Sequence, residues 1–374
     1  MTDPLRVVLA PNAFKGTLTA EEAATAMAAG VHAALPTALT ILRPLADGGD
    51  GSLDALEAAG FTRRPVTTRG PTGAPVAASF VVRERVAVVE LASACGLSLL
   101  PGGELHPMTS STAGVGDAIR AALDCDIDEL VICVGGSAST DGGAGMLAAL
   151  GVGLRDSLGE PVEACGSTLI RIAEVDMSGL DPRLTQVHIT VATDVTSPLL
   201  GPGGAAAVFA PQKGATPEHV GLLEAGLAHW SQVLAQTTAV DAAMLPGAGA
   251  AGGTAFAAIS VLNAEVISGA ELIAEAIGLA PAISAADLVI TGEGALDSQS
   301  RLGKGTGLAA GLAQQSGVPC IAVCGRVDLA SEQLREMGID DARGLTQADA
   351  VAGADALQSA TEAAVLQWHR RHRR

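Results

Sequence analysis

The same local pattern occurs at both ends of the chain: a short apolar run, a loop that contains glycine, and then a helix signature. Near the N-terminus, residues 5–10 form the apolar run, and Thr19 and Glu22 have the spacing of a capping box before an Ala-rich helix over residues 20–34. A second strand over residues 39–44 leads through a glycine-rich loop into another helix. Because strands that alternate with helices form parallel sheets, this pattern predicts an α/β fold.

The middle of the chain has a different character. Residues 61–95 alternate Thr, Val and Arg around glycine and proline, which indicates antiparallel hairpins. Later strand-like runs, each followed by a glycine-rich turn, occur at residues 130–134, 187–192, 288–291 and 319–324. We therefore predict a Rossmann-like parallel-sheet domain built from both termini, residues 1–65 and 285–374, with a mixed α/β domain of residues 66–284 inserted in it.

Charge and composition exclude several classes of partner. The net charge is -18, and five Phe, two Trp and no Tyr leave few platforms for base stacking, so a nucleic-acid partner is disfavoured. An anionic ligand needs a local positive field from a few Lys and Arg side chains or backbone N–H groups. The six cysteines form no C-x-x-C pair and no signal peptide is visible, so we expect free thiols and a cytoplasmic protein.

Residues 242–264 carry no charge, and by length alone they could span a bilayer. Proline and several glycines interrupt this Ala-rich run, which lacks the Leu, Ile and Phe density of a membrane span. We therefore expect a buried loop and helix here and no membrane partner.

Polar residues directly after strands are the first candidates for a site, because the carboxyl ends of parallel strands form the ligand crevice. Lys15 follows the first strand and precedes a helix N-terminus, where an anion binds favourably; the alternative is a solvated lysine. Asp47 follows the second strand beside glycines and could hold Mg²⁺ or accept a proton; the alternative is a turn or N-cap aspartate.

A third loop follows the strand at residues 288–291. It contains Glu293, Asp297 and Lys304, flanked by Gly292 and Gly303. Carboxylates, a lysine and glycine N–H groups are what phosphoryl transfer requires for metal binding, charge neutralisation and phosphate contacts. A purely structural turn is the alternative.

Two further loops add polar groups. Ser137 and Ser139 belong to a hydroxyl-rich nest at residues 135–143, which could bind phosphate or carboxylate, or could merely cap the next helix. Asp194 follows another strand, and Lys213 adds a cation.

Three common signatures are absent. Residues 247–252 fit G-x-G-x-x-G but follow a proline instead of a strand, so a dinucleotide site is disfavoured. Lys304 lacks the first glycine of a Walker A loop, and there is no G-x-S-x-G elbow. The seven histidines are scattered, which disfavours a zinc site.

Taken together, six motifs in order resemble the bacterial glycerate kinase type 1 family. They lie at residues 10–16, 46–51, 135–145, 211–215, 246–253 and 291–304. The resemblance implies ATP-dependent phosphorylation of D-glycerate, with 2-phosphoglycerate favoured over 3-phosphoglycerate as the product. It also implies two α/β domains with the active-site cleft between them.

The resemblance also suggests roles for the candidate residues. Asp47 or Asp297 would orient and deprotonate the attacking hydroxyl, and Lys15 would neutralise developing charge. Glu293, Asp194 or both would hold Mg²⁺, and the resemblance leaves open which of these residues takes the base, metal and cation roles. The expected nucleotide-binding residues are Lys304, Ser137, Ser139, Gly292 and Gly303.

The chain departs from the family pattern at three places. Asn12 and Ala13 stand where the family usually has Asp-Ser, Gly305 and Thr306 stand where it tends to Thr-Pro, and Ser197 replaces an Asn. Two alternatives to glycerate phosphorylation remain: a kinase for another small hydroxy acid, and a non-catalytic small-anion-binding protein on the same fold. The expected assembly is a monomer or homodimer.

Overall fold

The computed structural model describes residues 1–374 except residues 1–3, 15, 47, 298–299, 301–304, 346–352 and 373–374. The chain forms two compact units. Unit 1 comprises residues 1–47, 54–59 and 270–374, and unit 2 comprises residues 48–53 and 60–269. The domain boundaries expected from the sequence, near residues 65 and 285, stay a prediction.

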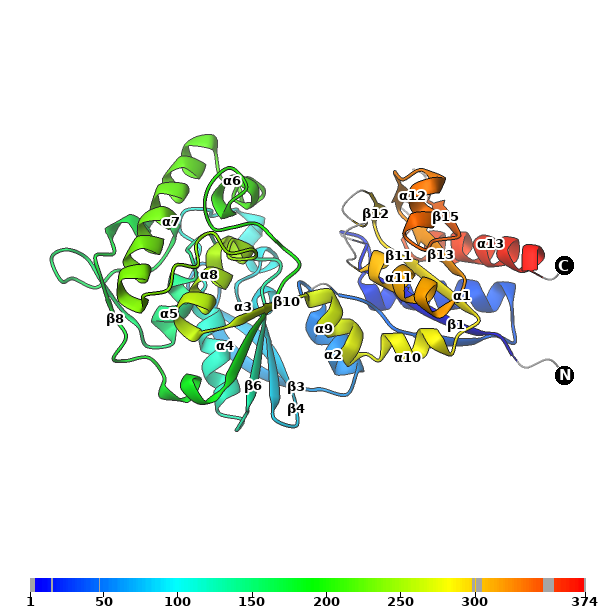
Figure 1. Ribbon diagram of the computed structural model, residues 1–374, viewed down its shortest axis with the longest axis horizontal. Helices are drawn as coiled ribbons and strands as arrows, with labels where there is room; N and C mark the ends of the chain where they lie inside the picture. Colours follow the sequence, from blue (N-terminus) through cyan, green and yellow to red (C-terminus); the bar gives the residue numbers. More distant parts are fainter. Residues whose placement is uncertain are drawn as a thin grey trace. The chain divides into compact units, whose positions relative to one another are not determined.

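A parallel five-stranded sheet forms the centre of unit 1 (Figure 1). Its order is β15-β13-β11-β1-β2, and every neighbouring pair is parallel. The strands are β1 (Arg6–Pro11), β2 (Leu39–Leu42), β11 (Leu288–Gly292), β13 (Cys320–Cys324) and β15 (Asp341–Gly344). Two strands thus come from the N-terminal part of the chain and three from the C-terminal part.

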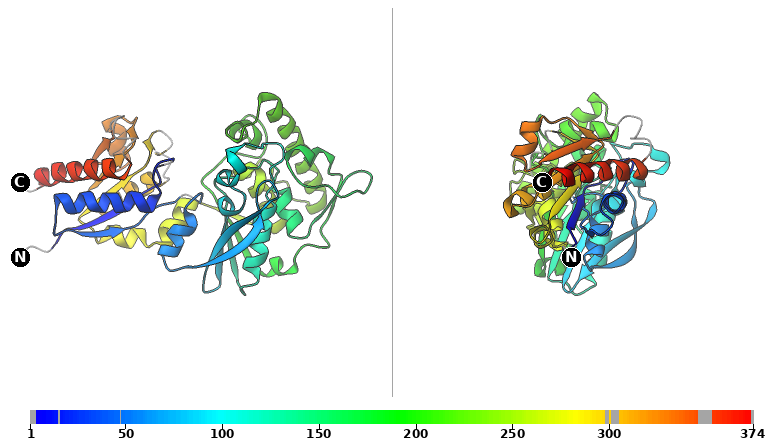
Figure 2. Two further views of the ribbon diagram at one scale, coloured as in Figure 1. Left: turned by 180° about the vertical axis from the view of Figure 1, so that it is seen from behind. Right: turned by 90° about the vertical axis from the view of Figure 1, so that its right-hand side faces the viewer.

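Helices cover both faces of this sheet. Helix α1 (Ala20–Ala34) and helix α13 (Ala354–His372) lie side by side, as Figure 2 shows, and pack on the face that presents Val7 and Leu9. Helix α11 (Thr306–Ser316) packs against β11 and β13. Its buried residues do not belong to the hydrophobic cluster that contains Val7 and Leu9, so α11 covers the other face of the sheet. The other elements here are α2 (Ser52–Ala58), α9 (Gly269–Ala276), α10 (Leu279–Ser284), α12 (Ser331–Glu336), β12 (Ala295–Leu296) and β14 (Arg326–Val327).

Local sequence explains where α1 begins and how it packs. The Thr19 side chain accepts a hydrogen bond from the backbone N–H of Glu22, whose carboxylate accepts one in return from the N–H of Thr19, so the predicted capping box is confirmed. A Cβ on Gly30 would lie 2.4 Å from the carbonyl oxygen of Gln358. Glycine at this position therefore allows α1 and α13 to approach closely.

Unit 2 contains a six-stranded sheet of order β10-β9-β6-β5-β4-β3. Strands β5, β6, β9 and β10 are parallel, whereas β3, β4 and β5 form the antiparallel part predicted for residues 61–95. The strands are β3 (Thr62–Arg69), β4 (Pro75–Arg83), β5 (Val86–Glu90), β6 (Glu129–Cys133), β9 (His188–Ala192) and β10 (Glu265–Ile267), and β7 (Gly153–Arg155) pairs separately with β8 (Glu174–Asp176).

The core of unit 2 gathers around Trp230 and Phe256, which are both buried. Trp230 lies on α7 (Pro217–Thr238), which begins at the predicted N-cap Thr216. Phe256 lies on α8 (Ala250–Leu262), so the uncharged run at residues 242–264 forms the predicted loop and buried helix. The remaining helices of unit 2 are α3 (Leu91–Cys95), α4 (Ala113–Leu123), α5 (Ala144–Ala149) and α6 (Ala205–Phe209), and the short 3-10 helix η5 (Pro211–Lys213) follows α6.

The predicted fold class is confirmed: a parallel-sheet α/β unit built from both ends of the chain, and a mixed α/β unit inserted in it. Among the residues that the structure describes, no helix combines the length and the apolar character needed to cross a membrane.

Candidate active site

The parallel strands of unit 2 end at the same level, so the loops that follow them share one edge of the sheet. Glu90 pairs with Cys133, Cys133 pairs with Ala192, and Ala192 pairs with Ile267. The carboxyl ends of parallel strands are where α/β proteins bind ligands. This edge of unit 2, with its loops, is called the unit 2 edge below.

The glycine-rich loop that follows residue 47 lies against the unit 2 edge. The N–H of Gly135 donates a 2.9 Å hydrogen bond to the carbonyl of Gly48, and a Cβ on Gly135 would lie 2.3 Å from the Cα of Gly49. The buried carboxylate of Glu90 accepts a 2.9 Å hydrogen bond from the N–H of Ser52. Two of the sequence motifs therefore contact each other backbone to backbone, which only glycine allows.

Asp50 is a candidate that the sequence reasoning missed. Its side chain is exposed, and its Oδ1 lies 3.2 Å from the position of a Cβ on Gly136. Gly136 has a φ of 73° and directly precedes Ser137. The sequence held a signal for this residue, because Asp50 is the second acidic residue of the motif at residues 46–51. The glycines of that motif bring Asp50 to the same edge as the hydroxyl-rich loop.

A buried lysine lies beneath the hydroxyl-rich loop. Lys213 is only 2% exposed, and its Nζ donates a 2.7 Å hydrogen bond to Ser137 Oγ and another to the carbonyl oxygen of Ser139. Burial lowers the pKa of Lys213 to about 7, and the nearby Asp141 opposes this shift. Both predicted nucleotide-binding serines are thus held by one side chain from η5.

Asp141 is fully buried in the same loop. Its carboxylate accepts hydrogen bonds from the N–H and hydroxyl of Thr112 at 2.8 Å, from the N–H groups of Gly143 and Gly145 at 3.2 Å, and from Ser111 Oγ at 3.5 Å. Burial raises the pKa of Asp141, and these hydrogen bonds oppose the shift. The carboxylate ties the loop at residues 139–145 to the start of α4.

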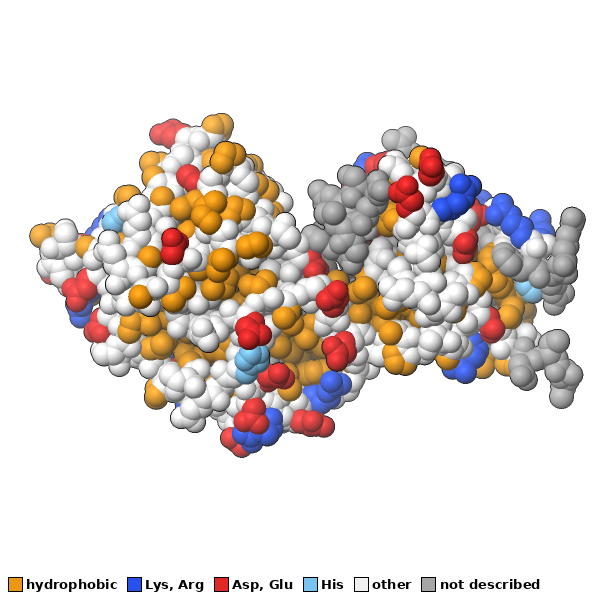
Figure 3. All heavy atoms as spheres, in the orientation of Figure 1, with side chains coloured by type: hydrophobic (Ala, Val, Ile, Leu, Met, Phe, Trp, Pro, Cys, Tyr) orange, Lys and Arg blue, Asp and Glu red, His pale blue; other side chains and the backbone are white. Residues whose placement is uncertain are grey.

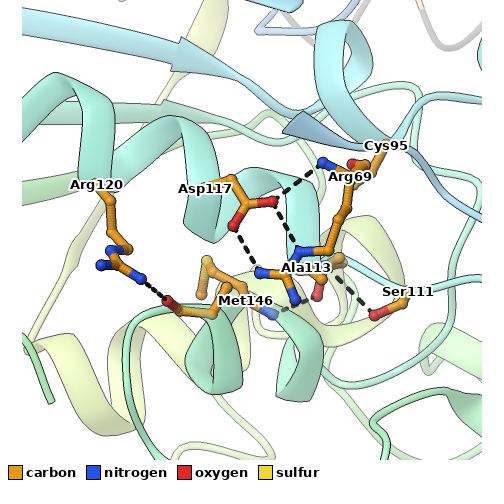
Figure 4. A network of polar contacts seen from close by, with 9 residues as sticks. Arg69, Cys95, Ser111, Ala113, Asp117, Arg120 and Met146 are labelled. Carbon is orange, nitrogen blue, oxygen red and sulfur yellow. Dashed lines mark hydrogen bonds and ion pairs between the residues drawn. The ribbon is translucent and has the colours of Figure 1, made fainter. Parts of the chain in front are cut away.

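Figure 4 shows how further contacts hold the start of α4. Thr112 Oγ1 accepts a hydrogen bond from the N–H of Met146, and Ser111 Oγ accepts one from Ala113. At the next turn of α4, Asp117 binds both Nε and Nη2 of Arg69 from β3. These contacts hold the start of α4, to which Asp141 ties the loop.

The glycine motif at residues 246–253 has a packing role in this structure. The N–H of Gly142 donates to the carbonyl of Gly252 at 2.9 Å, and a Cβ on Gly252 would lie 2.3 Å from the carbonyl oxygen of Ser139. Gly249 likewise donates to the carbonyl of Ser197 at 2.9 Å. The described residues 239–245, directly before the motif, form no strand, as the sequence indicated. The glycines allow two loops to contact each other through their backbones.

Asp194 completes the unit 2 edge after β9. Its side chain is half-buried, and its Oδ1 accepts a 2.7 Å hydrogen bond from Ser268 Oγ, which follows the neighbouring strand β10. Asp194 therefore shares this edge with Ser137 and Asp50.

The visible face of unit 2 presents little positive charge. Figure 3 shows that few Lys or Arg side chains reach the visible face of this unit and that they lie near its margins. With a net charge of -18 for the chain, attraction for an anion must come from local groups. Lys213 is such a group.

In unit 1 the candidates lie where the chain changes direction across the sheet. Strands β1 and β11 are neighbours, but β1 leads to β2 on one side and β11 leads to β13 on the other. Such a switch point is the usual ligand crevice of an open parallel sheet. The residues directly after these two strands, from Asn12 and from Glu293 onward, are called the unit 1 edge below.

Backbone contacts shape the unit 1 edge. The N–H of Asn12 donates to the carbonyl of Gly292 at 2.8 Å, and Asn12 Oδ1 accepts from the N–H of Ala13 at 2.8 Å. Glu293 is half-buried, and its carbonyl accepts a hydrogen bond from Gly325 at 3.0 Å. A Cβ on Gly292 would lie 1.9 Å from the carbonyl oxygen of Val323, so strand packing alone requires glycine there.

Asp297 lies just beyond β12 and is half-buried. Its N–H donates a 3.3 Å hydrogen bond to Ser300 Oγ. A Cβ on Gly305, the N-cap of α11, would lie 2.7 Å from Asn12 Nδ2. The start of α11 is therefore close to the loop after β1.

Four of the predicted site residues lie outside the described residues: Lys15, Asp47, Gly303 and Lys304. The structure brings together Ser137 and Ser139 around Lys213, places Asp194 at the same edge, and places Gly292, Glu293 and Asp297 together in unit 1. Within the described part of the chain, no three His, Cys, Asp or Glu side chains gather as a metal site.

Comparisons with known proteins agree on one family. The family model described as the glycerate kinase family matches residues 7–368. A glycerate kinase from Halalkalibacterium halodurans is 39% identical over 339 residues, covering 90% of this chain and 89% of that one. The glycerate 2-kinase of Escherichia coli is also 39% identical, over 340 residues, with the same coverage of both chains.

A solved structure agrees over the full length. The crystal structure of a protein from Salmonella typhimurium LT2, provisionally described as a glycerate kinase 2, matches with a TM-score of 0.83 and 36% identity. The match covers 99% of this chain and 100% of that one.

Proposed function

The chain belongs to the glycerate kinase family, and from this we propose that it phosphorylates D-glycerate with ATP, giving 2-phosphoglycerate in preference to 3-phosphoglycerate. The family and the kinase activity expected from the six motifs are confirmed. The name of the Escherichia coli relative, a glycerate 2-kinase, supports the choice of the 2-position.

The observation that best supports this proposal is the arrangement of the unit 2 edge. It combines a buried cation, serine hydroxyls and a glycine turn, which together can hold anionic oxygens within a strongly acidic chain. We propose that Ser137 and Ser139 contact the phosphates of ATP. Gly292, Gly303 and Lys304 are proposed to contribute from the loop after β11.

We assign the chemical step to carboxylates and lysines of the predicted motifs. Asp297 or Asp47 orients the attacking hydroxyl of glycerate and accepts its proton, while the γ-phosphoryl group leaves ADP and bonds to that oxygen. Lys15 neutralises the charge that develops on the transferred group, and Lys304 does so at the nucleotide.

The donor atoms fit Mg²⁺. This ion is bound by one or two carboxylates together with phosphate oxygens, so it does not require a cluster of three protein ligands. Glu293 and Asp194 are half-buried carboxylates directly after strands, and we propose that one or both hold it. When bound, Mg²⁺ neutralises phosphate charge.

The first experiment is to measure ADP release from the purified protein with Mg²⁺, ATP and D-glycerate, and then to test the product with enolase. ADP release with a product that enolase dehydrates supports the glycerate 2-kinase. ADP release with a product that enolase ignores assigns the 3-position instead.

Two other outcomes lead to the alternatives. ADP release that requires a different small hydroxy acid in a substrate panel would identify a kinase of that acid. No ADP release with any acid would favour a non-catalytic binder, against which the retained Glu293 and Asp297 argue. We also propose a cytoplasmic location and a monomer or homodimer, which size-exclusion chromatography with light scattering can test.

A further inference from the structure

Lys213 is an unusual buried cation because it has no carboxylate partner. Among the described residues, no Asp or Glu oxygen lies within 4 Å of its Nζ, although the side chain is only 2% exposed. Burying a charge without a counter-ion is unfavourable, so such groups persist where they serve a function. The partners of the ammonium group are instead Ser137 Oγ and the carbonyl oxygen of Ser139.

The polarity of the bond between Lys213 and Ser137 follows from the chemistry of the two groups. An ammonium group has three donors and no acceptor, so Ser137 Oγ must accept the hydrogen bond. The hydroxyl hydrogen of Ser137 is then left to donate elsewhere. Among the described residues, no other group accepts it.

The surroundings of Ser137 favour an anionic acceptor for that hydrogen. Ser137 directly follows the exposed, left-handed Gly136 at the unit 2 edge, where ligands of parallel sheets bind. Asp141, the charged group that interacts with Lys213, already accepts five hydrogen bonds. The positive charge of Lys213 is therefore not cancelled by an ion pair and can attract a ligand oxygen at Ser137.

We propose that Lys213 is a positioning residue of the kinase, which fixes the Ser137 hydroxyl as an outward hydrogen-bond donor to a phosphate oxygen of ATP. This inference rests on the proposed function, in which Ser137 contacts the nucleotide. Lys213 acts through Ser137 and does not itself touch the substrate.

A second consequence distinguishes this role from simple packing. When the ammonium group loses its proton, the neutral amine gains a lone pair, and Ser137 can then donate inward to Lys213. The outward donor is lost. Because burial lowers the pKa of Lys213 to about 7, binding of ATP should weaken as the pH rises through neutrality. Among the described residues, Asp141 of the hydroxyl-rich loop is the charged group that acts on Lys213, and helix α6, which packs against η5, carries no titratable side chain.

The test is a double-mutant cycle of Lys213→Met and Ser137→Ala, with kcat and the KM values for ATP and glycerate measured at pH 7. Each single variant is expected to lower kcat/KM for ATP by roughly 10- to 100-fold, the effect of losing one hydrogen bond to a charged group, with KM for glycerate nearly unchanged. The double variant should have about the same kcat/KM for ATP as the more impaired single variant, because both substitutions remove the same hydrogen-bond donor.

Trp230→Phe is the matched control. It removes a 3.0 Å hydrogen bond from Trp230 Nε1 to the carbonyl of Gly142, in the same loop, without touching Ser137. This variant should lower the unfolding temperature and leave KM for ATP unchanged. If Lys213→Met behaves like this control, or if the effects of Lys213→Met and Ser137→Ala multiply, the proposal is wrong.

A pH profile needs no Lys213 variant and so remains decisive if that variant does not fold. In the wild-type protein, kcat/KM for ATP should decrease above about pH 7, and Ser137→Ala should lack this decrease. The same decrease in both proteins would overturn the inference. Failure of the proposed function looks different, since the wild-type protein would then release no ADP at any pH.

Discussion

The two sheet edges that carry the candidate residues are built in different ways. At the unit 2 edge, loops contact each other through glycine backbones, and a fully buried carboxylate and a buried lysine fix their shape. At the unit 1 edge, Glu293 and Asp297 are half-buried and lie in the loops that follow β11 and β12. Under the proposed function, unit 2 would supply a rigid binding surface, whereas unit 1 would supply the carboxylate that accepts the proton of the substrate.

Replacement of Asp297 should lower the catalytic rate strongly and leave the stability of the fold nearly unchanged. If Asp297 is the base, Asp297→Asn lowers kcat by roughly 10²- to 10⁴-fold, because the attacking hydroxyl loses its proton acceptor. The half-buried side chain contributes little to packing, so the unfolding temperature should change little. Steady-state kinetics and calorimetry on the same preparation measure both. Near-normal turnover would transfer the role to Asp47.

Gly135→Ala, at the unit 2 edge, should instead lower the stability of the fold. The added methyl group would lie 2.3 Å from the backbone of Gly49, so the loops must separate, at a cost of about 3 kcal/mol in the free energy of unfolding. Urea denaturation measures the loss. Gly221→Ala on α7, where a Cβ meets nothing within 4 Å, is the matched control and should stabilise by about 0.5–1 kcal/mol. Equal effects of both substitutions would contradict the backbone contact.

The pH dependence of stability tests whether burial lowers the pKa of Lys213. Its pKa is about 7 in the folded state and 10.5 in the reference state, so the unfolded chain binds more protons between these values. The free energy of unfolding should therefore increase with pH, by about 2 kcal/mol between pH 7 and pH 9. Denaturation of the wild-type protein and of Lys213→Met at several pH values measures the difference. A wild-type curve parallel to that of Lys213→Met would show that the pKa of Lys213 is not lowered in the folded protein.

The smallest effect is expected in unit 1, at the cap of α1. Thr19→Ala removes the acceptor of the Glu22 N–H and should lower the free energy of unfolding by about 1 kcal/mol. Thr19→Ser keeps the hydroxyl and serves as the control. Both variants should retain normal KM values; a large change in KM for ATP would indicate that the α1 cap shapes the nucleotide site.

Local signals predicted much of the fold from the sequence. The capping box at Thr19 predicted the start of α1 and the Ala-rich run predicted its end, both to the residue, and Thr216 before a proline predicted the start of α7. Apolar runs predicted most strand ends to within two residues, and Gly317 predicted the end of α11. The two-residue strands β12 and β14 were not predicted, because so short a run carries no periodic pattern.

The candidate site was less predictable because its contacts are not local. Lys213 and Ser137 are 76 residues apart, and nothing near either residue indicates that they are bonded or that the lysine is buried. The motif at residues 46–51 directed attention to Asp47, whereas the structure shows Asp50 at the hydroxyl-rich loop. Glycines were recognised as motif residues, but their role in backbone contacts between distant loops depends on tertiary packing.

The pairing of β1 with β11 also determines when each unit can form during synthesis. The N–H of Arg6 bonds to the carboxylate of Asp287, 281 residues later, so the first strand emerges long before its neighbour. At roughly 5–20 residues per second, the interval is on the order of 10–60 s. Residues 60–269 are contiguous and can fold within it. Meanwhile β2 can cover one edge of β1, but the unpaired backbone N–H and C=O groups of the edge that faces β11 stay open to other chains, so unit 1 is the part of the nascent protein that most needs a chaperone.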